Sequence, residues 1–238
     1  MIFLFVIIGI SLSIVIYTQQ LSQNDSKPID VLSLIEIETS KNIKSKRVML
    51  ENYIWVNDVI PITKLPTKIK QSYVDTKFDT FQNVERIDRI SIDMEYGVDS
   101  IAYMFFPKQS NNELLIYHQG HRGDILFGKS TIEFFLNEGY TILTFSMPLL
   151  GDNSKPTVYI DDLNENIVLD NHDKLEFLES DKFSPIQFFV EPIYVSLNYI
   201  DSGFDFDSYN FVGLSGGGWV AIIYSGFDDR ISKTVSVA

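Results

Sequence analysis

Ser215 is the residue whose surroundings point most directly to chemistry. It lies in the run GLSGG at residues 213–217, which fits the pattern G-x-S-x-G. In this pattern a serine occupies a sharp, strained turn between a strand and a helix, so that its hydroxyl is exposed. The apolar residues 209–212 and 219–224 supply the strand and the helix that the pattern requires. The sequence therefore predicts a serine nucleophile at position 215.

A second motif, YHQGHRG at residues 117–123, follows the apolar run 114–117. Together with GLSGGGW at residues 213–219, it resembles the α/β-hydrolase superfamily, and more narrowly its dienelactone-hydrolase and acetyl-xylan-esterase-like branches. The resemblance covers roughly residues 84–238. It implies that Ser215 hydrolyses a carboxylic ester through an acyl-enzyme, and it implies no cofactor. The substrate is expected to be a small-molecule or polysaccharide ester.

The resemblance also implies an oxyanion hole made of two backbone N–H groups. One belongs to Gly216, and the other lies within residues 119–121, where we favour His121 over Gln119. Amides fixed at a helix N-terminus point at the charge that develops on a carbonyl oxygen. One such donor lowers the barrier by about 3–4 kcal/mol.

The chain has three histidines, His118, His121 and His172. His118 and His121 lack a third ligand in view, so we predict no metal site. Neither is expected to be the catalytic base, because the base follows the serine in the chain order of this fold. We expect His118 and Gln119 to bind substrate beside the oxyanion loop, with a plain glycine turn as the alternative. His172 is expected to be a solvated loop residue, with a pocket-lining role as the alternative.

After Ser215 the sequence contains two acids, Asp228 and Asp229, and no histidine. These acids are predicted to form a turn rather than part of a triad. We therefore expect the chain to be the N-terminal part of a longer hydrolase that carries the acid and the base further on, and to be inactive alone. A non-catalytic binding protein on the same fold and a serine peptidase of this fold remain the alternatives.

Composition excludes several classes of protein. The net charge of −13 argues against nucleic acid as a partner, because phosphate binding needs a basic surface. The absence of cysteine excludes disulfides and thiolate chemistry. The length of 238 residues and the 45% hydrophobic content suit one substantial α/β domain. The oligomeric state is left open.

The N-terminal segment predicts a location outside the cytoplasm. Residues 1–17 are apolar and uncharged, which favours a signal anchor over residues 1–21, with a cleaved signal peptide as the alternative. We therefore expect a membrane-anchored or secreted protein. Residues 22–82 are expected to be a linker and an N-terminal extension. Residues 83–238 then form a partial α/β-hydrolase domain, with an acidic surface excursion at 147–182.

Hydrophobic patterning predicts alternating strands and helices, and therefore a mostly parallel sheet with helices on both faces. The C-terminal strands and helices of the α/β-hydrolase fold are expected to be missing. Pro192 is expected to kink or split its helix. The expected strands cover residues 84–94, 98–106, 114–117, 140–145, 209–212 and 231–237. The expected helices cover residues 46–57, 127–137, 184–200 and 216–227.

Overall fold

The computed structural model describes residues 37, 39–56 and 60–237. The chain separates into two units, Met1–Lys44 and Ser45–Ala238, and the fold described below belongs to the second. The predicted signal anchor at residues 1–21 lies outside the described residues. Within the described part of the chain, no helix has the length and apolar character needed to cross a bilayer.

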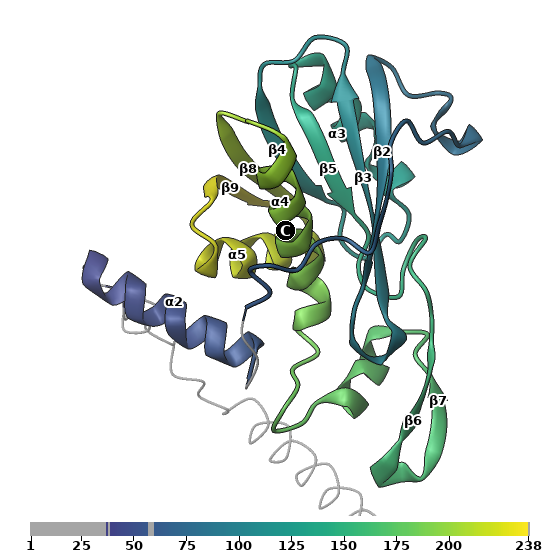
Figure 1. The fold of residues 1–238 in the computed structure, drawn as a ribbon, viewed down its shortest axis with the longest axis vertical. Coiled ribbons are helices and arrows are strands. Elements are labelled where there is room, and N and C mark those ends of the chain that lie inside the picture. The colour runs from purple at the N-terminus through teal and green to yellow at the C-terminus, as the bar shows by residue number, and fades with distance from the viewer. Residues whose placement is uncertain (1–36, 38, 57–59, 238) are drawn as a thin grey trace, which may run out of the picture. The chain divides into compact units, whose positions relative to one another are not determined.

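A seven-stranded mixed sheet forms the centre of the fold (Figure 1). The pairs β1–β2, β2–β3 and β3–β5 are antiparallel. The pairs β5–β4, β4–β8 and β8–β9 are parallel. The predicted α/β class is confirmed, and the parallel part of the sheet is the half that ends at the serine turn. In spatial order the strands are β1 (Lys68–Lys70), β2 (Val84–Asp93), β3 (Asp99–Pro107), β5 (Thr141–Phe145), β4 (Glu113–His118), β8 (Ser208–Leu214) and β9 (Ile231–Val237).

Helices cover both faces of the sheet, as predicted (Figure 1). Helices α4 (Gln187–Gly203) and α5 (Gly216–Phe227) pack on one face, and α3 (Lys129–Asn137) packs on the other. In β4, Leu114 and Ile116 belong to the first core, while Leu115 belongs to the second. This strand is apolar throughout because side chains on both of its faces are buried.

Helix α4 departs from the prediction at Pro192. Of the two outcomes predicted at Pro192, a kink or a split, the split is wrong, because Gln187–Gly203 is one helix with Pro192 inside it. A proline in a helix interior costs about 3 kcal/mol through its missing N–H and its clash with the preceding turn. Burial of Phe188, Ile193 and Leu197 against the sheet offsets that cost, since each such side chain contributes about 1.5–3 kcal/mol.

Residues 45–56 and 60–82, which belong to the predicted linker and extension at 22–82, contribute directly to the folded unit. Helix α2 (Ser40–Ile54) ends in Ile54 and is followed by Trp55, and both side chains belong to the core beneath α4 and α5. Strand β1 pairs with β2, although the sequence predicted no strand there. Phe78 joins the opposite core. The compact unit therefore begins well before residue 83, at Ser45.

The acidic excursion is an ordered subdomain between β5 and α4. It contains a separate two-stranded sheet, β6 (Thr157–Ile160) and β7 (Glu165–Val168), followed by the 3-10 helix η6 (His172–Leu178). Leu175 and Leu178 of η6 are buried in the core shared with α4. At the start of the excursion, Asp152 accepts hydrogen bonds from Lys77 and from the Tyr103 hydroxyl. The excursion is therefore attached to the sheet near its start and to the core beneath α4 near its end.

Candidate active site

Ser215 sits at the junction between β8 and α5, where β8 ends at Leu214 and α5 begins at Gly216. Its backbone has φ 55° and ψ −126°, a conformation that residues with a Cβ rarely adopt. The residue is exposed, and its N–H donates to the Val237 carbonyl at 2.6 Å. The turn therefore presents a serine hydroxyl on a strained backbone that β9 holds in place.

The glycines of the motif are required by close backbone packing. A Cβ at Gly213 would lie 2.1 Å from the Gly217 carbonyl oxygen, and a Cβ at Gly217 would lie 2.1 Å from the His118 carbonyl oxygen. Both contacts involve backbone atoms, which have little freedom to move. A side chain at either position would therefore force the backbone segments apart.

The loop after β4 lies directly against this turn. In the parallel ladder His118 is the partner of Gly213, so β4 ends beside the serine turn. Gly120 has φ +81°, and a Cβ on it would lie 2.4 Å from the Leu214 oxygen and 3.1 Å from the Gly216 nitrogen. The loop and the turn that were predicted to supply the two oxyanion donors are therefore adjacent.

Helix α5 presents the amides of its first two residues to an anion. The first N–H groups of an α-helix lack partners one turn back, and in α5 the Gly218 N–H donates to the Ser215 carbonyl, which leaves Gly216 and Gly217 at the front of the helix. Together with the helix dipole, these groups favour negative charge in front of the N-terminus. The N–H of Gly120, in contrast, donates to His118 Nδ1 at 3.2 Å, which leaves His121 as the next amide along the loop.

His118 and Gln119 are buried, with 1% and 3% of their surfaces exposed. Burial, followed by nearby charge on His121, lowers the pKa of His118 to about 3, so this ring is neutral near pH 7. The Gln119 side chain accepts a hydrogen bond from the Tyr117 hydroxyl. Both side chains thus make their hydrogen bonds within the loop, and their contact with substrate stays a prediction.

His121 is exposed and lies over the serine turn. A Cβ placed on Gly216 would come within 2.4 Å of both Cε1 and Nδ1 of the His121 ring, and within 2.5 Å of Met147 Cε. Gly216 therefore leaves just enough room for the imidazole and the thioether that cover it. Sequence reasoning missed Met147 here, because nothing in its local pattern distinguishes it from a core residue.

His172 reaches the site from the excursion. Its ring centroid lies 5.2 Å from that of His121 and 5.2 Å from that of Phe189. Phe189 in turn packs edge-to-face on Trp219, at 5.4 Å. His172 is half-buried, so the expectation of a solvated loop histidine is wrong and the pocket-lining alternative fits. Four rings from four segments thus form one wall beside Ser215.

A cavity of about 260 Å³ adjoins this wall. It is lined in part by His172 and Phe189, and Glu176 and Glu179 supply its charged groups. Tyr53 of α2 also lines it. The lining of the cavity therefore combines aromatic, apolar and acidic side chains.

The two acids after Ser215 lie at the far end of α5. Asp228 is the residue after a helix of 12 residues, which places it about 18 Å from the turn at 1.5 Å per residue. It is buried, and it accepts hydrogen bonds from Tyr224 and Arg230. Asp229 is exposed and pairs with Arg47 at 3.4 Å. Among the described residues, no carboxylate is hydrogen-bonded to His121 or His172.

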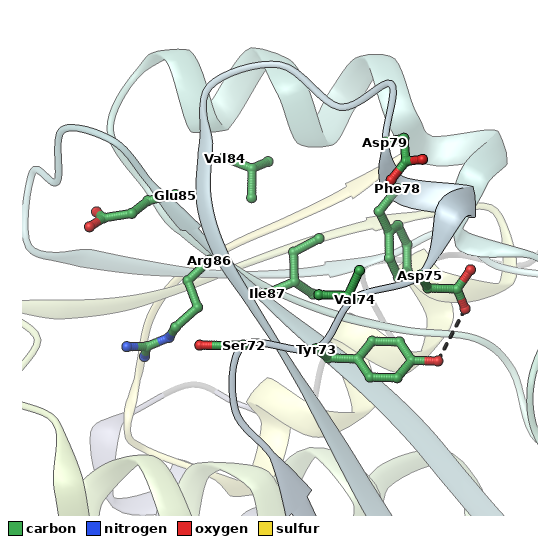
Figure 2. A pocket seen from close by; sticks show the side chains of 10 residues that line it. All are labelled: Ser72, Tyr73, Val74, Asp75, Phe78, Asp79, Val84, Glu85, Arg86 and Ile87. Atoms are coloured by element: carbon green, nitrogen blue, oxygen red, sulfur yellow. Dashed lines mark hydrogen bonds between the residues drawn. The ribbon is translucent and has the colours of Figure 1, made fainter.

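A larger cavity, about 460 Å³, lies elsewhere on the molecule. It is lined by residues around the N-terminal end of β2, whereas Ser215 follows the C-terminal end of β8. Figure 2 shows Arg86 and Glu85 extending to one side of it and Tyr73 and Phe78 lying on the other. Its polar groups do not converge on a point, so it offers no catalytic arrangement.

No group of three metal-ligating side chains occurs in the part of the chain that the structure describes. The groups that the described residues bring to the site are a hydroxyl, backbone amides and imidazoles.

The sheet order, the strained serine turn and the helices on both faces define the α/β-hydrolase fold. No protein-family model matches the chain, and no curated protein matches it. Solved structures match at low sequence identity. Acetyl xylan esterase 1 from Thermoanaerobacterium sp. JW/SL YS485 is 14% identical, with a TM-score of 0.54, and the match covers 82% of this chain and 57% of that one.

A second similar structure comes from Bacteroides fragilis NCTC 9343 and is provisionally described as an acetyl xylan esterase. It is 14% identical, with a TM-score of 0.56, and the match covers 82% of this chain and 52% of that one. At this identity the likeness establishes the fold. The chain spans slightly more than half the length of these structures.

Proposed function

We propose that this protein is a serine hydrolase that cleaves a carboxylic ester through an acyl-enzyme. The observation that carries the proposal is the conformation of Ser215, exposed at positive φ between β8 and the free amides of α5. A backbone strain of about 1–3 kcal/mol persists where the surrounding structure enforces it, and such sites concentrate at active centres.

In the proposed reaction, Ser215 Oγ attacks the ester carbonyl carbon and its proton passes to a base. The carbonyl oxygen becomes an oxyanion, which accepts hydrogen bonds from the N–H groups of Gly216 and His121. Collapse of this intermediate breaks the bond to the alcohol, which leaves with the proton from the base. Water then attacks the acyl-enzyme, releases the acid and restores the serine.

The base and its acidic partner belong to the proposal as residues outside those described. Within the described chain His118 is buried beneath the loop, and the Nε2 of His172 is already bonded to the Pro148 carbonyl. Asp228 is bound to Arg230 at the far end of α5. The fold's chain order places the acid and then the histidine after the serine. We therefore keep the prediction that both follow residue 238.

The proposed substrate is an ester of a small alcohol or of a polysaccharide. The names of the two similar structures, one an acetyl xylan esterase and the other provisionally described as one, support an ester of a short acyl group. The cavity beside His172 and Phe189 is the proposed place for a neutral part of the substrate, because its charged lining residues, Glu176 and Glu179, repel anions. The extracytoplasmic location remains part of the proposal on the sequence of residues 1–17.

Labelling of the full-length protein by a fluorophosphonate probe tests this function. The probe forms a covalent bond with an activated serine, so we expect labelling of the wild-type protein and none of Ser215→Ala. Hydrolysis of p-nitrophenyl acetate should show the same dependence. A folded, unlabelled wild-type protein that hydrolyses the ester no faster than Ser215→Ala would rule out the proposal.

A further inference from the structure

The backbone around His121 is closely packed on its Gly120 side only, since a Cβ at Gly123 would meet nothing within 4 Å. His121 lies between Gly120 and Gly123, which have φ values of +81° and +84°. Glycine populates positive φ as readily as negative φ, so a segment between two such residues has many accessible conformations. The amide proposed to bind the oxyanion therefore belongs to a segment that needs support from outside the loop.

Side chains from other segments supply that support. On one side the His121 ring lies against Gly216 and Met147. On the other side it meets the ring of His172 edge-to-face, with an interplanar angle of 63°. His172 is the contact that comes from the excursion, more than fifty positions away along the chain.

His172 is itself fixed in orientation. Its Nε2 lies 2.8 Å from the Pro148 carbonyl oxygen, and because a carbonyl can only accept, the ring proton is on Nε2. Phe189 packs against the same ring. Burial lowers the pKa of His172 and charge on His121 lowers it further, against the opposing effects of the Pro148 hydrogen bond and Asp173. A neutral ring can lie against His121 without repelling it.

We propose that His172 is a positioning residue of the ester-hydrolysis site, whose ring holds His121 against Gly216 and so keeps the His121 N–H aimed at the developing oxyanion. This inference rests on the proposed function. It assigns the excursion a part in forming the oxyanion hole, in addition to lining the cavity.

The expected effect on catalysis depends on the stage of the reaction at which the His121 N–H binds the oxyanion. A hydrogen bond to the oxyanion strengthens in the transition state, so its loss lowers kcat and leaves KM nearly unchanged. Since His172 acts through His121, its loss misaligns one donor instead of removing it. We expect His172→Ala to lower kcat, and the rate of fluorophosphonate labelling, by about 10-fold, less than the 10²–10³-fold for outright removal of a donor.

Four variants of the full-length protein separate the ring contact from the hydrogen bond. His172→Phe and His172→Tyr keep an aromatic ring against His121, whereas His172→Gln keeps an N–H donor for Pro148 without a ring. We expect the two aromatic variants to keep the wild-type labelling rate within about 3-fold. His172→Gln should lose as much of the labelling rate as His172→Ala does. Two aromatic variants are used so that the comparison stands if one of them folds poorly.

Ring signals in ¹H–¹⁵N spectra report the geometry independently of activity, because the chain has three histidines to assign. The ring nitrogen shifts of His121 should move in His172→Ala and His172→Gln and stay near wild type in His172→Phe. Asn171→Ala is the matched control. It removes the side-chain cap of η6, which accepts from the Lys174 N–H, but leaves the His172 ring in place. It should lower stability without changing kcat.

The inference is overturned if His172→Gln is labelled as fast as His172→Phe. It is also overturned if the ring nitrogen shifts of His121 are the same in His172→Ala as in the wild type. A wild-type protein that is never labelled overturns the proposed enzyme function instead. In that case the histidine spectra still decide whether His172 holds His121, so the two failures are distinguishable.

Discussion

The imidazole of His121 occupies the space that a side chain at Gly216 would need. A methyl group at position 216 would approach Cε1 of this ring to 2.4 Å, whereas at Gly217 it would approach a backbone carbonyl to 2.1 Å. These two adjacent glycines therefore have different purposes. One makes room for a side chain of the site, and the other permits the packing of the loop against the helix.

Substitution of each glycine by alanine separates these purposes. Gly217→Ala should destabilise the fold by about 3 kcal/mol, because two backbone segments would have to move apart. Gly216→Ala should cost about 1 kcal/mol, since the His121 and Met147 side chains can swing aside. Urea denaturation measures both.

The Gly216→Ala variant also tests whether His121 belongs to the reactive site. Gly216→Ala should lose most of its fluorophosphonate labelling while remaining folded, because the displaced ring no longer defines the oxyanion site. Full labelling of this variant would contradict the placement of His121 in the site.

The strain at Ser215 predicts that the nucleophile is held at a cost in stability. Ser215→Gly and Ser215→Ala both remove the hydroxyl, but only glycine adopts φ 55° without a steric penalty. We expect the glycine variant to be more stable than the alanine variant by about 1 kcal/mol, since relief of the strain exceeds the entropy cost of glycine. Thermal and urea unfolding of the two inactive proteins provide the comparison, and equal stabilities would mean that the turn is unstrained.

Buried His118 predicts a pH dependence of stability. Its pKa is lowered from about 6.5 in the unfolded chain to about 3 in the folded protein. The unfolded state therefore binds a proton at a higher pH than the folded state does. The stability associated with neutral His118 is fully present above pH 6.5 and is lost progressively as the pH falls toward 3.

His118→Asn isolates this effect, because Asn Oδ1 can accept the Gly120 hydrogen bond but does not titrate. Between pH 6.5 and 4 the free energy of unfolding should fall less steeply in this variant than in the wild type. Parallel curves for the wild type and His118→Asn would show that His118 binds its proton equally in the folded and unfolded states, which would contradict the lowered pKa.

Asp228 is expected to stabilise the fold without taking part in catalysis. It accepts hydrogen bonds from Tyr224 and Arg230 and is almost fully buried, so Asp228→Ala should destabilise the protein by about 3 kcal/mol. The labelling rate of the folded fraction should stay within about 2-fold of wild type. Asp229→Ala, which removes an exposed partner of Arg47, should cost less than about 1 kcal/mol. A large loss of labelling in a fully folded Asp228→Ala protein would show that Asp228 takes part in catalysis.

The parts of the site that depend on local sequence were predictable. The serine turn and its glycines follow from a short motif between an apolar strand and an apolar helix, and the structure has all three where they were expected. Strand β4 was found for the same reason, since its run of apolar residues is itself the signal for burial on both faces.

The remaining parts depend on contacts between distant segments. His172 looked solvated because its neighbours in sequence are acidic, whereas its neighbours in space are His121 and Phe189. Pro192 was expected to be able to split its helix because propensity is local, while the burial that keeps α4 intact is tertiary. The three residues of β1, Lys-Ile-Lys, are too few and too polar to show a strand pattern.

The β6–β7 hairpin pairs with no strand of the main sheet. Its tip, at Asp161–Leu163, leads into Asn164 in a left-handed conformation. A change of length at this tip shifts no register in the seven-stranded sheet. Related chains can therefore acquire or lose residues there at little cost to folding. For the same reason, the tip is a suitable place to insert a fluorophore or an affinity peptide that leaves the serine turn undisturbed.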